Sequence, residues 1–160
     1  MTTNSLERFE RAARRAHTVH EPTAERAEPL HPFEQRNISS AFPVLVSRLF
    51  DDGYYAQATF EAAKFVDKEV QRHSKLSVSG FKLMMAALAS ENPVVKLTPC
   101  ATESETDEQK GFQFIFAGSS MAIRNPRGHE HSVPDDVDTC LDHLSLLSLL
   151  LRRLAEAGYK

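Results

Sequence analysis

The sequence predicts an all-α protein, built as an antiparallel bundle of four to five helices with a helical arm in front of it. Apolar residues recur every three or four positions in several segments, which is the period of a helix that buries one face. Short turn signals with Gly or Pro separate these segments, so neighbouring helices should reverse direction. A chain of 160 residues can bury one core of this kind. We therefore predict an arm and linker at residues 1–36 and one helical domain at residues 37–160.

The predicted arm differs in composition from the rest of the chain. Residues 6–16 are rich in Arg, Glu and Ala, and Asn4 with Glu7 fits a capping box at the start of a helix. The apolar stripe of this helix is thin and consists of Leu6, Phe9, Ala13 and Ala16. Prolines then interrupt the chain at Pro22, Pro29 and Pro32. We expect an arm that either docks on another surface or frays.

The domain should begin with a helical hairpin. Ser39 or Ser40 is the predicted cap of the first helix, which tolerates Pro43 in its first turn and places Phe42, Leu45, Val46, Leu49 and Phe50 at core spacing. Asp-Asp-Gly at 51–53 ends this helix. A second helix from Tyr54 to about His73 carries a stripe of Tyr55, Ala58, Ala62, Phe65 and Val66. The short turn makes the two helices antiparallel.

The middle of the domain mixes a short helix, a loop and a long helix. The short helix follows Ser79 and should turn Phe81, Met84, Ala87 and Leu88 inward. Residues 93–97 are predicted to be extended, and 100–109 to be an acidic loop leading into a helix start. The long helix, from about Asp107 to Arg124, has one apolar stripe of Phe112, Ile115, Phe116, Ser119 and Ile123 and another of Phe114, Ala117, Gly118 and Met121. We expect this helix to be buried on both sides.

The last helix is rich in leucine. Ser132 with Asp135 fits a capping box, Pro134 suits the first turn, and Gly158 marks the end. Its predicted inward residues are Val137, Leu141, Leu144, Leu147, Leu151 and Leu154, with Leu146, Leu149 and Leu150 around the side. Together with the helix at 107–124, this gives more apolar surface than one core needs. The surplus fits a homodimer face or a thick monomeric core, and we favour the homodimer because closed dimers are the commonest oligomers.

Composition limits the classes of function. The formal net charge is −3, so any contact with nucleic acid must come from a local basic patch. Cys100 and Cys140 are predicted to be reduced thiols. No apolar run reaches the length of a membrane span and no signal peptide is recognisable, so we expect a cytoplasmic protein without a membrane partner. We predict no cofactor and no metal, since the sequence has no Gly-rich phosphate loop and His129 and His131 lack the spacing of a zinc-protease motif.

The stretch 124–129, Arg-Asn-Pro-Arg-Gly-His, concentrates the reactive chemistry of the chain. Pro126 biases Asn125 away from helical geometry, and the two residues suit the cap and first position of a new helix. We therefore expect a helix to stop near Arg124 and a new turn to begin at Pro126. Such a break would let Arg124 and His129 converge on one point.

An arginine and a histidine at one point can cleave RNA without a metal. His129 can transfer protons near neutral pH, and Arg124 can hold the non-bridging phosphate oxygens with its fork of donors. A two-fold dimer would supply the second histidine that acid and base roles require. The alternative is that both side chains only cap carbonyls or pair with a carboxylate such as Glu130. Glu61 and Lys64 are predicted to be surface groups that could face the same cleft.

The pattern Arg-Asn-x-x-x-His after the penultimate helix of an α bundle resembles the signature of the HEPN superfamily. More narrowly, the chain is similar to the Ymh-like group of bacterial and phage proteins. The likeness covers about residues 38–157 and leaves the arm unmatched. It is carried by the stretches 49–58, 60–64, 83–84, 111–112, 116–118 and 123–130.

This resemblance implies a HEPN-like bundle and a metal-independent endoribonuclease that works as a dimer, often as a toxin or in phage defence. Arg124 and His129 would be catalytic, with Asn125 helping to orient them. Arg127 has no general family role, and we add it as a phosphate contact. The implied partners are RNA, such as tRNA or mRNA, and an antitoxin or other neutralising protein. Some HEPN members are inactive, so the alternatives are a non-catalytic module that binds nucleotide, RNA or protein, and a purely structural dimerisation domain.

Overall fold

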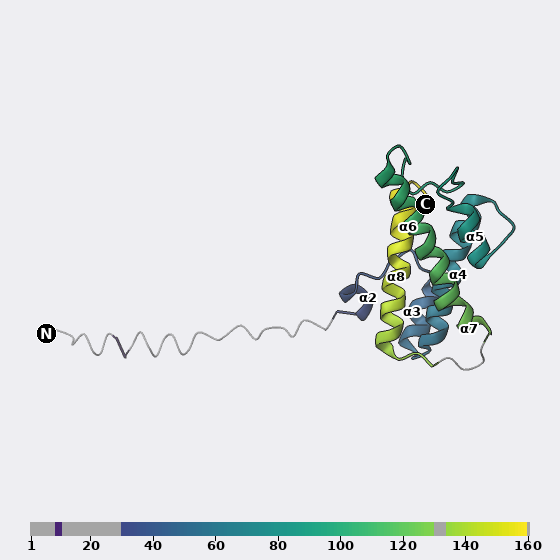
Figure 1. Cartoon of the computed structure of the whole chain (residues 1–160). Helices are drawn as coiled ribbons and strands as arrows, with labels where there is room; N and C mark the ends of the chain where they lie inside the picture. The colour runs from purple at the N-terminus through teal and green to yellow at the C-terminus, as the bar shows by residue number, and fades with distance from the viewer. Residues whose placement is uncertain (1–8, 11–29, 130–133, 160) are drawn as a thin grey trace. The chain divides into compact units, whose positions relative to one another are not determined.

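The structure is a computed structural model that describes residues 9–10, 30–129 and 134–159, and the regular elements among them are all helical. Contacts divide the chain into a unit Met1–Leu30 and a unit His31–Lys160 (Figure 1). Of the first unit, the structure describes Phe9 and Glu10 as helical, and the rest of the predicted arm helix lies outside the described residues. The second unit confirms the all-α class and includes Pro32, which the sequence assigned to the linker.

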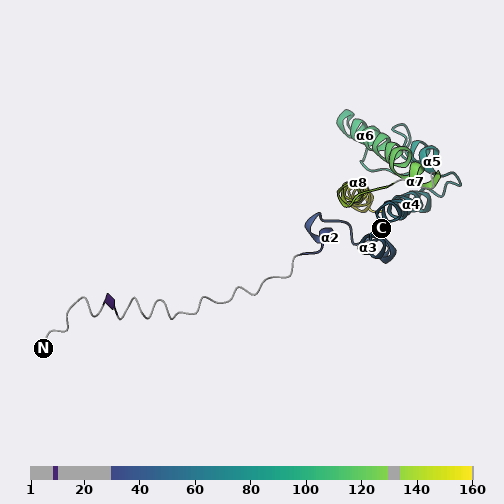
Figure 2. The ribbon, with the colours of Figure 1, turned by 90° about the horizontal axis from the view of Figure 1, so that it is seen from below.

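The central helix of the second unit is α4, Tyr55–Ser74, which packs against α3, α5, α7, α8 and the segment η1. Figure 2 shows α4 among these elements, with α3 on one side and α5 and α7 on another. The remaining elements in chain order are α2 Pro32–Gln35, α3 Val44–Asp51, α5 Gly80–Ala87, α6 Glu103–Ser119, the π-helical η1 Ser120–Arg124, α7 Asn125–His129 and α8 Val137–Glu156.

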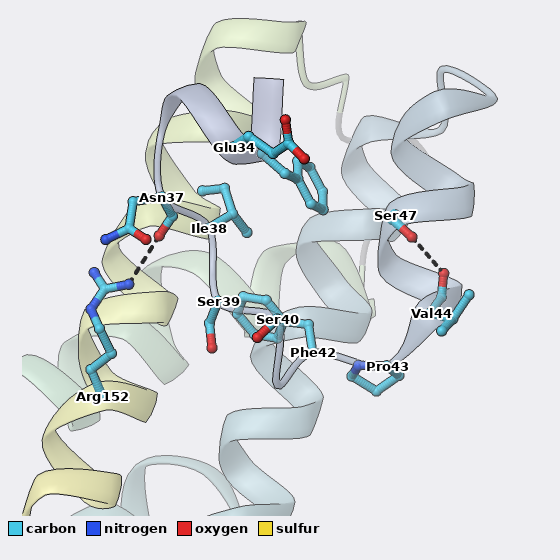
Figure 3. A pocket seen from close by; sticks show the side chains of 11 residues that line it. Glu34, Asn37, Ile38, Ser39, Ser40, Phe42, Pro43, Val44, Ser47 and Arg152 are labelled. Atoms are coloured by element: carbon cyan, nitrogen blue, oxygen red, sulfur yellow. Dashed lines mark hydrogen bonds between the residues drawn. The ribbon is translucent and has the colours of Figure 1, made fainter. Parts of the chain in front are cut away.

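The predicted helical hairpin is confirmed in α3 and α4, which are joined by a tight turn in which Gly53 has φ +80°. The predicted caps of α3 are wrong, because the helix starts after Pro43 and makes no side-chain cap. Ser39 instead donates its N–H to the Ser148 hydroxyl, at 2.9 Å, and belongs to the turn before α3. This turn, α2, α3 and Arg152 of α8 line a pocket of about 620 Å³ (Figure 3).

A buried glutamine, Gln109, holds the loop between α5 and α6. The Gln109 amide donates to the Leu88 and Val95 carbonyls, both at 3.1 Å, and accepts the Leu97 N–H at 2.8 Å. The loop is irregular rather than extended at 93–97. A capping box of Thr102 and Glu105 starts α6 at Glu103, four residues before the predicted start.

Each of the two apolar stripes predicted for this helix is only partly buried. Phe116, Ala117 and Ile123 lie in the core, whereas Phe114, Ile115 and Met121 are exposed. The predicted burial on both sides is therefore wrong for the single chain. Other predicted inward residues that lie exposed are Leu45, Phe81 and Val137.

The predicted helix break before Pro126 is also wrong. Asn125 is helical, with φ −65° and ψ −45°, and its N–H bonds to the Ser120 carbonyl one residue further back than in an α-helix. Proline lacks an N–H and its ring crowds the carbonyl four residues earlier in a regular helix. The wider π turn of η1 accommodates Pro126, so α6, η1 and α7 follow one another without a gap.

The start of α8 differs from the prediction, and its end agrees with it. Asp136 is the N-cap and accepts the Thr139 N–H at 2.7 Å, a bond that lowers the pKa of Asp136. Ser132 lies outside the described residues, and the Asp135 carboxylate is bound by Arg127 instead of capping the helix. Gly158, with φ +92°, follows the last turn.

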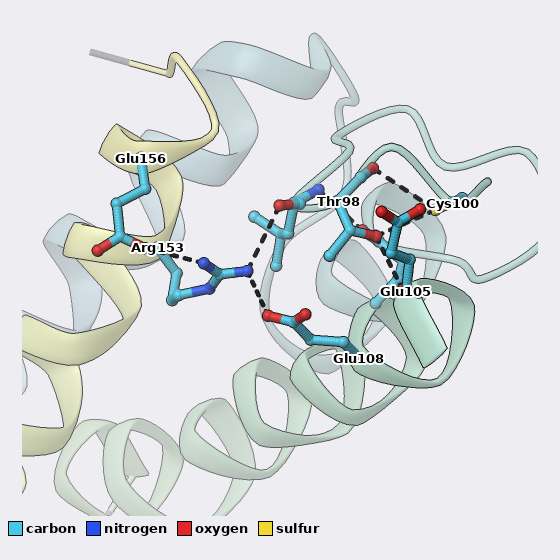
Figure 4. A network of polar contacts seen from close by, with 8 residues as sticks. Thr98, Cys100, Glu105, Glu108, Arg153 and Glu156 are labelled. Atoms are coloured by element: carbon cyan, nitrogen blue, oxygen red, sulfur yellow. Dashed lines mark hydrogen bonds and ion pairs between the residues drawn. The ribbon is translucent and has the colours of Figure 1, made fainter. Parts of the chain in front are cut away.

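Arg153 links the far end of α8 to α6 (Figure 4). Its guanidinium donates to Glu108 of α6 at 2.6 Å, to Glu156 at 2.8 Å and to the Leu97 carbonyl at 3.4 Å. The same group lies over the Phe112 ring, 4.8 Å from its centre. The arginine therefore joins α8, α6 and the loop before α6.

Candidate functional site

Arg124 ends η1, and its guanidinium lies beside the start of α5. Nη1 is 3.8 Å from the position that a Cβ on Gly80 would take. Nη1 donates to the side-chain oxygen of Asn125 at 3.2 Å. Nε is buried and has no hydrogen-bond partner, and among the described residues no carboxylate lies within ion-pair distance of Arg124. Arg124 is thus a partly buried cation without a counter-charge in the described part of the chain.

Ser120 lies one turn before Arg124 and approaches the same point. Its hydroxyl is 3.4 Å from the Cβ position at Gly80, is buried, and has no hydrogen-bond partner. Gly80 has φ +63°, a left-handed conformation that favours glycine. The Gly80 N–H is satisfied by the buried carboxylate of Asp67 at 2.8 Å. The unsatisfied Ser120 hydroxyl and Nη1 of Arg124 therefore both lie beside the Gly80 turn, whose own N–H is bound by Asp67.

Arg127 has the opposite environment to Arg124. Its Nε donates to one oxygen of Asp135 at 2.8 Å, its Nη2 donates to the other, and its Nη1 donates to the Ile123 carbonyl at 2.8 Å. The side chain of Arg127 is 6 % exposed and that of Asp135 is 2 % exposed. A guanidinium bound in this way faces protein groups, so the phosphate contact predicted for Arg127 stays a prediction that would require the ion pair to open.

The structure describes the backbone of His129 as the last residue of α7, while its side chain lies outside the described atoms. The neighbouring Gly128 contacts α4, because a Cβ there would lie 3.0 Å from the Phe60 ring. Lys64 lies near the same ring, with Nζ 5.9 Å from its centre, and pairs with Glu61 at 3.0 Å. The stretch of α4 that carries Glu61 and Lys64 therefore runs beside α7.

The described part of the site brings Arg124 and Asn125 together and turns Arg127 away toward α8. Sequence reasoning missed Gly80, Ser120 and Asp135 as neighbours of this segment. Ser120 was recognisable from its spacing of one helical turn to Arg124. No local pattern connects Arg124 to Gly80, because they meet through the tertiary fold.

The family of the chain is decided by its match over residues 43–154 to a family model described as "Protein of unknown function (Hypoth_ymh)". The chain belongs to the Ymh family. The Ymh-like resemblance is thereby confirmed, and the wider HEPN relationship stays a prediction. No curated protein and no solved structure matches the chain. The Ymh match includes α3 to α7 and most of α8, and thus the whole segment from Arg124 to His129.

Outside residues 124–129, a metal site, a reactive thiol or a membrane-spanning helix would indicate another function for the Ymh chain. Across the described ranges, no three His, Cys, Asp or Glu side chains gather where they could hold a metal ion. Cys100 and Cys140 are both free thiols, and burial raises the pKa of Cys140. None of the helices in the described ranges has the length and apolar character to cross a bilayer.

The pocket beside α3 contains none of the predicted site residues. Its walls are mainly apolar, and Arg152 reaches across from α8 to donate to the Asn37 carbonyl at 3.0 Å (Figure 3). Glu34 also lines the pocket, so one acidic and one basic side chain are among its lining residues. The pocket has the size of a small-molecule site, but nothing in its lining selects one chemical class of ligand.

Proposed function

We propose that this Ymh-family chain is a HEPN-type endoribonuclease that cleaves RNA without a metal ion. The observation that carries the proposal is the environment of Arg124. This arginine is partly buried, has a buried Nε without a hydrogen-bond partner, and has no carboxylate partner in the described part of the chain. Arg153 has a similar Nε but is paired with two carboxylates, so the missing counter-charge is what sets Arg124 apart. Burying a cation without a counter-charge costs stability, and a ligand that pairs with Arg124 would explain its environment. A phosphate suits the guanidinium fork.

The proposed reaction uses the 2′-hydroxyl of the RNA as the nucleophile. His129 takes the proton of that hydroxyl, and the 2′-oxygen forms a bond to phosphorus while the bond from phosphorus to the 5′-oxygen breaks. Arg124 stabilises the added negative charge on the non-bridging oxygens, and Asn125 orients the guanidinium. A protonated His129 of a second subunit gives its proton to the leaving 5′-oxygen. The products are a 2′,3′-cyclic phosphate and a 5′-hydroxyl.

The proposed homodimer would place the exposed apolar face of α6 and η1 in the interface. Phe114 and Met121 on this face are each 54 % exposed, and the face leads toward Arg124. Ala117 is buried in the core and is therefore not a test residue for this interface. Met121→Glu should shift the protein from dimer to monomer in sedimentation. An equal dimer fraction in Met121→Glu and wild type would remove this interface from the proposal.

The cleavage test uses purified protein and mixed single-stranded RNA in EDTA. Wild type should produce fragments with cyclic-phosphate ends, while Arg124→Ala and His129→Ala should lose at least about a hundredfold in rate. Arg48→Ala, an exposed arginine on α3, is the matched control and should cleave like wild type. Equal RNA loss in all four samples would indicate a contaminating nuclease and would overturn the proposal.

The second candidate is a non-catalytic module that binds RNA, nucleotide or a partner protein at the same face. The net charge of −3 and the exposed apolar residues of α6 favour a protein partner in this case, such as a second copy or a neutralising protein. The same experiment separates the candidates. RNA that is bound but left intact by wild type would favour the module.

A further inference from the structure

A second group of charged residues lies next to the proposed site and is not part of it. Arg127 of α7, Asp135 just before α8, and His143 of α8 form one cluster, which we call the α7 clamp. Arg127 binds Asp135 with two parallel hydrogen bonds, and its Nη2 also lies 3.3 Å from Nδ1 of His143. Arginine can only donate, so Nδ1 of His143 accepts this bond and the imidazole is neutral.

The side chains of the α7 clamp are largely buried, unlike those of an ordinary surface ion pair. Asp135 and Arg127 are almost fully covered, and His143 closes the outer side with 24 % of its side chain exposed. A buried ion pair adds little net stability, because the cost of removing both charges from water offsets their attraction. Its two parallel hydrogen bonds do, however, fix the orientation of Arg127 on α7 relative to Asp135 before α8.

Apart from its direct continuation from η1, α7 is positioned by few contacts with other elements. This helix has only five residues, Asn125–His129, and the described chain resumes at Pro134, one residue before Asp135. On the α4 side, Gly128 lies against the Phe60 ring. On the α8 side, Arg127 is tied to Asp135 and His143. These two anchors tie α7 to α4 on one side and to α8 on the other.

We propose that Arg127, Asp135 and His143 are positioning residues, which hold the α7 backbone at the angle that the proposed reaction requires of His129. This inference rests on the proposed ribonuclease function. It assigns Arg127 an indirect role through α7, in place of a direct phosphate contact. Loss of the α7 clamp should then reduce turnover without reducing RNA affinity, because Arg124 is held by η1.

The test replaces the buried pair by apolar residues of similar size, Arg127→Met with Asp135→Leu. Such a replacement should leave the melting temperature within about 5 °C of wild type, because the desolvation cost disappears with the attraction. We expect kcat for RNA to fall at least tenfold with KM within about twofold, and amide exchange in residues 125 and 127–129 to rise at least tenfold. The matched control is the exposed pair that ties residue 36 to α8, Arg36→Met with Asp142→Leu, which should change none of these values.

Unchanged kcat or unchanged protection of the α7 amides in the folded double variant would overturn the inference. If that variant fails to fold, Asp135→Asn, which keeps the shape and removes the charge, replaces it with the same expected split between kcat and KM. If wild type itself does not cleave RNA, the proposed function fails and the positioning role fails with it. Amide exchange still shows in that case whether the clamp holds α7, so the two failures are distinguishable.

Discussion

Arg124 and Arg127 lie one helical turn apart and have opposite environments. Arg127 donates to both oxygens of a buried carboxylate, to a backbone carbonyl and to a histidine. Arg124 has one weak contact to its own neighbour and a buried Nε without a hydrogen-bond partner. Arg153 also has a buried Nε without a partner, but two carboxylates neutralise its charge. A structural arginine is thus paired with a carboxylate, whereas a binding arginine leaves its charge for a ligand. The comparison separates a residue that holds the fold from one that is available for chemistry.

The largest predicted effect is the difference in stability between alanine variants of these two arginines. Arg127→Ala leaves Asp135 buried and unpaired, which should reduce the free energy of unfolding by about 3–5 kcal/mol. Arg124→Ala leaves no carboxylate behind and should cost less than about 1 kcal/mol. Urea unfolding of both variants measures the difference. Similar losses in the two variants would show that Arg124 is also structural.

The second prediction concerns the turn beside Arg124. Gly80→Ala forces a side chain into left-handed backbone and brings a methyl group within 3.4 Å of the Ser120 hydroxyl, so it should destabilise by about 1–2 kcal/mol. Gly111→Ala is the control, because Gly111 is helical with nothing within 4 Å of its Cβ position. That control should stabilise by about 0.5–1 kcal/mol. Thermal unfolding checks both signs, and a stabilising Gly80→Ala would disprove the close approach of α5 to η1.

The difference between the two arginines could not be predicted from the sequence. The helical period and the Asp-Asp-Gly turn were sufficient for α3 and α4, since both signals are local. The partner of Arg127 lies beyond a helix end, at a spacing of 8 that belongs to no regular element. Arg124 meets Gly80 through the fold alone. The prediction of a helix break at Pro126 was wrong for another reason. A residue before proline usually avoids helical geometry, but the π turn of η1 allows it for Asn125, and no pattern in the sequence predicts a π turn.

The third prediction tests the outer side of the α7 clamp by pH. Burial, and then the charge of Arg127, lower the pKa of His143, with Asp135 and Asp142 opposing the shift. In the unfolded chain the pKa of histidine is about 6.5. As pH falls below that value the unfolded chain takes up a proton before the folded chain does, so the free energy of unfolding decreases until His143 is also protonated in the fold.

His143→Asn keeps an acceptor near Arg127 and cannot titrate, so the loss of stability between neutral and mildly acid pH should become smaller. Urea unfolding at several pH values measures this slope. His73 is the comparison residue, because burial and then Arg72 lower its pKa as well, outside the clamp. His73→Asn should also reduce the slope, without changing amide exchange in α7. If His143→Asn leaves the pH dependence of the free energy of unfolding unchanged, the pKa of His143 is not shifted by its neighbours in the α7 clamp.

The smallest predicted effect on stability belongs to Ser120→Ala. The Ser120 hydroxyl is buried without a partner, so its removal loses no hydrogen bond and should change the free energy of unfolding by no more than about 1 kcal/mol, in the stabilising direction. Ser148→Ala is the control, because the Ser148 hydroxyl accepts the Ser39 N–H and donates to the Leu144 carbonyl, and its loss should destabilise by about 1–3 kcal/mol. Denaturant unfolding compares the pair. A destabilised Ser120→Ala would mean that the Ser120 hydroxyl supports the fold. The unsatisfied groups around Arg124 would then no longer distinguish a binding site from the structural environment of Arg127.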